Sequence, residues 1–87
     1  MINVKKKSEK EFTVTVEEAG GRSEHAVTLD DEYYQHLTQG KIEKEELVRK
    51  SFEFLLQRES KESILSKFDL RIISRYFPEF ESEVKRS

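Results

Sequence analysis

The stretch EFTVTVEEAGGRSEHAVTL, from Glu11 to Leu29, decides the expected architecture. Two runs within it alternate between apolar and polar residues, which is typical of strands that bury one face. Between the runs lies Gly20-Gly21, a dipeptide that tolerates positive φ at both positions. We therefore predict a two-stranded antiparallel hairpin with Gly20-Gly21 as its two-residue turn.

This turn determines which residues face each other across the hairpin. Ala19 would pair with Arg22, and all the apolar side chains would then fall on one face of the hairpin. The expected pairs on that face are Val16 with His25, Val14 with Val27, and Phe12 with Leu29. The other face would pair Glu17 with Glu24, and two like charges there indicate contact with water. Because a lone hairpin is marginally stable, it should pack on helices or pair with another chain.

The chain beyond Leu29 reads as helical. Asp30 is a candidate N-cap for a short helix that closes near Gly40. The longest predicted helix runs from about Glu43 to Arg58, and its apolar positions cover about 200° of the helical wheel. A stripe of about 100° is enough to face one core, so this helix should be covered on two sides. Its apolar positions are Leu47, Val48, Phe52, Phe54, Leu55 and Leu56.

Two further helices are expected near the C-terminus. Ser60 is a candidate N-cap for residues 61–68, and Asp69 for residues 70–77. Pro78 disfavours helical geometry at the preceding residue and should end the last helix. The predicted fold class is therefore α+β, with an N-terminal two-stranded antiparallel hairpin packed against about four helices.

Length and composition suggest one small domain. We assign residues 1–10 to a polar flexible N-terminus, 11–81 to a single compact α+β domain, and 82–87 to a polar C-terminal tail. Of the 87 residues, 34% are hydrophobic and 39% are charged, so any core is thin. Self-association into a homodimer would bury more apolar surface.

The composition also argues against several classes of function. The net charge of −2 gives no strong field for nucleic acid, and the absence of cysteine excludes a disulfide scaffold or a thiolate site. The first residues carry no apolar run of a secretory signal, and no run approaches the roughly 18 residues of a membrane span. We therefore expect a cytoplasmic protein without a membrane partner.

A search for catalytic or metal-binding patterns finds none that is complete. The chain lacks the GxSxG, P-loop, GxGxxG and HExxH motifs. Glu32 and His36 have a helical spacing that a metal could use, but no third ligand is evident, so a surface pair is the simpler interpretation. His25 is expected at the rim of the inner sheet face, shielding Val16. We predict no enzyme activity, no cofactor, no metal and no small-molecule substrate.

Part of the chain resembles the ribbon-helix-helix family of DNA-binding regulators and antitoxins. The similarity lies in VTLDDEYYQHL and GKIEKEELVRKSFEFL, about half of the chain. The matching positions are Leu29, Asp30, Gly40, Glu46, Leu47, Val48 and Arg49. The resemblance implies an antitoxin or repressor as an alternative function. The residues that would face the major groove are Glu24, Ala26 and Thr28, whereas base readout favours Arg, Lys, Asn or Gln.

A second resemblance covers FEFLLQRESKESILSKFDLRIISRYFPEFE, from Phe52 to Glu81. This segment is similar to the C-terminal signature of a group of short bacterial proteins without assigned function. The resemblance implies a bacterial or archaeal origin and brings no activity with it.

The apolar stretch Phe68–Phe80 contains the candidate interaction residues. Leu70, Ile73 and Phe77 are most simply core, whereas Tyr76 and Phe80 could form an exposed docking patch beside Arg71 and Arg75. We therefore predict a small non-enzymatic protein-interaction or regulatory module. Its expected partner is another protein or a second copy of this chain, rather than nucleic acid.

Overall fold

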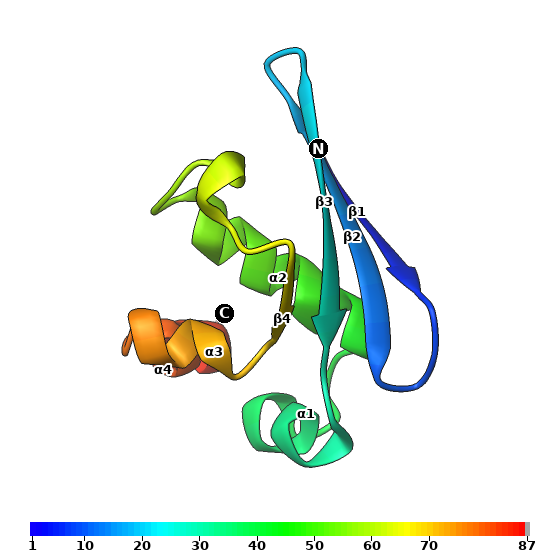
Figure 1. The fold of residues 1–87 in the computed structure, drawn as a ribbon. Coiled ribbons are helices and arrows are strands. Elements are labelled where there is room, and N and C mark those ends of the chain that lie inside the picture. The colour runs from blue at the N-terminus through cyan, green and yellow to red at the C-terminus, as the bar shows by residue number, and fades with distance from the viewer. Residues whose placement is uncertain (87) are drawn as a thin grey trace.

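The computed structural model describes residues 1–86 and has the predicted α+β class. The strands are β1 (Ile2–Lys6), β2 (Glu11–Glu18), β3 (Gly21–Thr28) and β4 (Lys67–Asp69). The helices are α1 (Asp31–Thr38), α2 (Lys44–Leu56), α3 (Ile72–Tyr76) and α4 (Phe80–Arg86), with a short 3-10 helix, η1 (Lys61–Ser63). Figure 1 shows the sheet close to edge-on, with α1, α3 and α4 on the same side of it.

The sheet is larger than the predicted two-stranded hairpin, which is corrected here to four strands in the order β1-β2-β3-β4. β1 to β3 are antiparallel, and β4 runs parallel to β3. β1 lies within residues 1–10, which are predicted as a polar flexible N-terminus. Its Ile2 and Val4 face Val16 and Val14 of β2 and pack against the core, so only two apolar residues tie this arm to the sheet.

The β2–β3 hairpin turns one residue earlier than predicted. Its central residues are Ala19 and Gly20, with φ of 52° and 77°, the sign that a type I′ turn requires at both positions. The pairing shifts by two residues, which preserves the apolar face because side chains alternate with period two. The observed pairs include Phe12 with Val27, Val14 with His25, and Val16 with Ser23. Glu17 faces Arg22, so an attractive pair replaces the predicted like-charged one.

Gly21 lies close to the Lys61 side chain and, unlike Ala19 and Gly20, has no positive φ. A Cβ at this position would lie 2.9 Å from the Nζ atom of Lys61, whose side chain is buried in front of β3. The end of the hairpin therefore lies directly against η1.

Residues 61–68, predicted as a helix, form η1 and then extend into β4. The physical reason is the second edge of β3, whose backbone groups need partners. The Ala26 N–H donates to the Ser66 carbonyl, and the Leu70 N–H donates to the Thr28 carbonyl. Three residues of strand satisfy that edge, and they place Phe68 opposite Val27 on the inner face of the sheet.

The central helix α2 is covered on two sides, as its wide apolar stripe predicts. Towards the sheet, the Phe52 ring lies 5.2 Å from the His25 ring and 6.0 Å from that of Phe68. On the other side, the Phe54 ring lies 5.8 Å from Phe77 and 5.1 Å from Phe80. The core is therefore continuous from the sheet through α2 to α3 and α4.

The helix termini follow the local signals in the sequence. Asp30 caps α1 by accepting a hydrogen bond from the Tyr33 N–H at 2.7 Å. Gln39 and Gly40 both have positive φ where α1 ends. Asp69 accepts a hydrogen bond from the Arg71 N–H at 2.9 Å before α3. α4 occupies part of the expected polar tail, and Phe80 and Val84 are its buried residues.

Within residues 1–86, no helix combines the length and the apolar character needed to cross a membrane.

Candidate apolar docking groove

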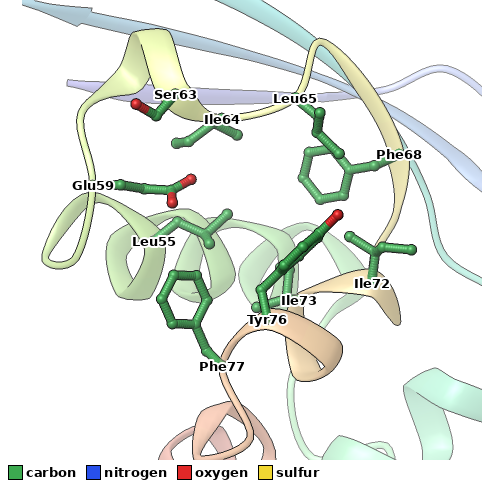
Figure 2. Close-up of a pocket in the computed structure, with 10 residues that line it drawn as sticks. All are labelled: Leu55, Glu59, Ser63, Ile64, Leu65, Phe68, Ile72, Ile73, Tyr76 and Phe77. Atoms are coloured by element: carbon green, nitrogen blue, oxygen red, sulfur yellow. The ribbon is translucent and has the colours of Figure 1, made fainter.

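An apolar groove lies between the end of α2, the loop from η1 to β4, and α3. Its cavity measures about 230 Å³, and Figure 2 shows the side chains that surround it. Most of the lining is apolar; the residues are Leu55, Glu59, Ser63, Ile64, Leu65, Phe68, Ile72, Ile73, Tyr76 and Phe77. Three separate segments of the chain therefore build the groove, which forms only when they pack together.

The rim of the groove carries unusual exposed apolar surface. In the part of the chain that the structure describes, three large hydrophobic side chains are exposed, namely Met1, Leu65 and Tyr76. Leu65 is 51% exposed and Tyr76 is 68% exposed, and both line the groove. In Figure 2 Tyr76 rises from α3 towards Leu65 across the groove. Two exposed apolar side chains therefore flank one apolar hollow.

His25 holds the Leu65 side of the rim in place. Its Nδ1 atom lies 2.7 Å from the Leu65 carbonyl oxygen, which can only accept, so Nδ1–H is the donor. In the neutral ring Nε2 then accepts from the Ser23 hydroxyl at 2.9 Å. The ring is buried and faces Val14, rather than shielding Val16 at the rim as predicted. β3 therefore positions the loop that carries Leu65.

The four sequence-predicted interaction residues do not share one surface. Tyr76 lies on the rim of the groove, whereas Phe80 has no exposed surface and packs on Phe54. Arg71 and Arg75 line a separate hollow with α1 and α4. Positions 71 and 75 lie about 100° around the helix from positions 72 and 76. The aromatic side chain and the two cations therefore line different hollows.

The second hollow is a polar junction of three helices. The Tyr33 hydroxyl donates to Glu81 Oε2 at 2.9 Å, and His36 Nε2 lies 3.4 Å from Glu81 Oε1. Burial, and next the bond to Glu81, raise the pKa of the Tyr33 hydroxyl. Arg71 lies over the Tyr33 ring at 5.0 Å and pairs with Asp30. The polar groups in this hollow bind one another and connect α1, α3 and α4.

His36 therefore pairs with Glu81 rather than with Glu32, the partner predicted from helical spacing. Among residues 1–86, no group of three or more His, Asp or Glu side chains could hold a metal ion.

Sequence reasoning missed the groove because the helix predicted over residues 61–68 includes both Ile64 and Leu65. In an extended segment, adjacent side chains point in opposite directions. Ile64 is therefore buried while Leu65 is exposed. The adjacent apolar pair between two polar residues is the one local signal that could have indicated a split between core and surface.

No protein-family model, no curated protein and no solved structure matches this chain.

Proposed function

We propose that this chain is a small non-enzymatic protein-interaction or regulatory module, and that the apolar groove is its docking surface. The observation that carries the proposal is the exposed pair Leu65 and Tyr76 on the rim of an apolar cavity. A chain with only 34% hydrophobic residues has few to leave in water. Covering this surface with a partner would bury the rim residues and an aromatic anchor of the kind that dominates protein interfaces.

The ribbon-helix-helix alternative is not favoured by a specific observation. β3 carries the matching strand residues, and it is already paired with β2 on one edge and with β4 on the other. A two-stranded ribbon that enters the major groove would need this strand to be accessible. We therefore retain the interaction module as the proposed function.

Site-specific photo-crosslinking tests the proposal. p-Benzoylphenylalanine would replace Tyr76 on the groove rim, and in a control it would replace exposed Lys41, which precedes the opposite end of α2. On irradiation in the native host, position 76 should give discrete protein adducts that position 41 does not give. Adducts that also form when the purified chain is irradiated alone would identify a second copy as the partner. Identical patterns from both positions would contradict a docking function of the groove.

A further inference from the structure

One carboxylate inside the groove has no partner among residues 1–86. In Figure 2 the Glu59 side chain points from the turn after α2 into the ring of lining residues, beside Leu55 and Ile64. Glu59 is partly buried, and its backbone N–H donates to the Leu55 carbonyl at 2.9 Å, which fixes its position. Across residues 1–86, its carboxylate makes neither a hydrogen bond nor an ion pair.

The cations nearest in sequence are already engaged. Arg58 pairs with Glu79 at 3.1 Å and lies over the Phe54 ring at 3.7 Å. Lys61 pairs with Glu62 at 2.9 Å and is buried against Gly21. The chain therefore places a negative charge in an apolar groove and uses its neighbouring positive charges elsewhere.

This combination has a defined chemical complement. A carboxylate beside apolar walls is partly shielded from water, so an incoming cation interacts with it more strongly than it would in bulk water. Arginine fits best among protein side chains, because its methylene stem packs on apolar surface and its planar guanidinium binds a carboxylate and stacks on aromatic rings. Tyr76 and Phe77 supply such rings at the groove. A cavity of about 230 Å³ is smaller than the roughly 300–1,000 Å³ of small-molecule sites and suits a single side chain.

We propose that the groove binds a partner protein through one arginine side chain, with its stem between Leu55 and Ile64 and its guanidinium on Glu59. This inference rests on the proposed function and names the chemistry of the partner. Tyr76 would cover the arginine from the α3 side, and Leu65 would contact the flanking residues of the partner. A docked lysine would bind more weakly because its ammonium cannot form the paired hydrogen bonds or stack.

The test uses two probes of the same shape, 1-butylguanidinium and neutral 1-butylurea, titrated into the ¹⁵N-labelled full chain. We expect saturable shifts of the Leu65 and Tyr76 amide signals, with butylguanidinium binding about fivefold more tightly than butylurea, the upper end for partly exposed ion pairs. Glu59→Gln should reduce this preference to within about twofold. Glu53→Gln, the same change at an exposed site on α2, should preserve it.

The outcomes separate this inference from the proposed function. Equal binding of the two probes, or a preference that persists in Glu59→Gln, would overturn the arginine site and leave the cross-linking result at Tyr76 standing. If the preference for butylguanidinium depends on Glu59 but position 76 gives no protein adducts, the result would contradict a protein partner. A second copy of the chain is the remaining possible occupant, and sedimentation of the chain alone tests for it. A dimer that Glu59→Gln dissociates would assign the groove to that second copy.

Discussion

Tyr76 and Phe80 are four positions apart in the sequence, but the first side chain is exposed and the second is buried. Phe80 has 0% of its surface exposed and packs edge-on against Phe54, whereas Tyr76 is 68% exposed. The turn at Pro78 separates them, because α3 ends at Tyr76 and α4 begins at Phe80. Two aromatic residues four positions apart can therefore belong one to the surface and the other to the core.

Alanine substitution should distinguish the two aromatic residues. Phe80→Ala should lower the free energy of unfolding by about 3–5 kcal/mol, since it leaves a cavity beside Phe54. Tyr76→Ala should change it by no more than about 0.5 kcal/mol, as is usual for surface substitutions. Urea denaturation followed by circular dichroism measures both. A large loss of stability in Tyr76→Ala would mean that the groove rim is part of the core.

At the scale of elements, β1 shows how few residues can anchor a strand. Ile2 and Val4 point to the core, and Asn3 and Lys5 alternate with them towards water. The main-chain N–H and C=O groups of the odd-numbered residues face β2. Just after β1, for example, the Lys7 N–H donates to the Glu11 carbonyl at 2.8 Å. The Ile2 carbonyl accepts from Arg49 of α2 at 2.6 Å, so a side chain also holds the outer edge.

A pair of neighbouring substitutions tests this strand. Val4→Asp should lower the free energy of unfolding by about 1–3 kcal/mol, because it brings an unpaired charge to the sheet–helix interface. Asn3→Asp introduces the same side chain on the exposed face and should change stability by about 0.5 kcal/mol or less. Urea midpoints at neutral pH provide the comparison. Equal, small effects would indicate a loose N-terminal arm instead of a strand.

For the whole molecule, the dependence of stability on pH follows from its carboxylates. The Tyr33 N–H, and then Arg71, hold the pKa of Asp30 below its usual range. Lys44 does the same for Asp31. The pKa values of Glu9, Glu62 and Glu79 are also lowered. A lowered folded-state pKa adds stability that is fully present above the unfolded value of about 4 and is lost as pH falls through the folded value.

Asp30 offers a matched test of this acid sensitivity. Asp30→Asn keeps a side-chain oxygen that can cap α1 and removes the charge, so stability should fall less between pH 7 and pH 3 than in the wild type. Glu24→Gln removes an exposed charge on β3 that has no ion pair among residues 1–86 and should leave the pH dependence unchanged. Thermal unfolding at both pH values measures the difference. An unchanged loss in Asp30→Asn would contradict a role for this carboxylate.

Much of the fold could be predicted because its signals are local. Alternation in β2 and β3, the Asp30 cap, and the double-sided stripe of α2 depend on residues a few positions apart. The register failed by two residues because a two-residue slip keeps every side chain on its face, so periodicity alone cannot detect it. The charged residues could have indicated the correct register, since only the observed register places Glu17 opposite Arg22.

The α+β class, the inward faces of the long elements and the ends of α1 and α2 follow from the amino-acid sequence, because these features depend on neighbours along the chain. The strands Ile2–Lys6 and Lys67–Asp69, which complete the sheet, become evident from the folded chain, since such short strands carry little periodicity and form where an edge needs partners. The same holds for the groove. Leu65 and Tyr76 form its rim, and Glu59 brings a carboxylate to it, because three segments of the chain meet there.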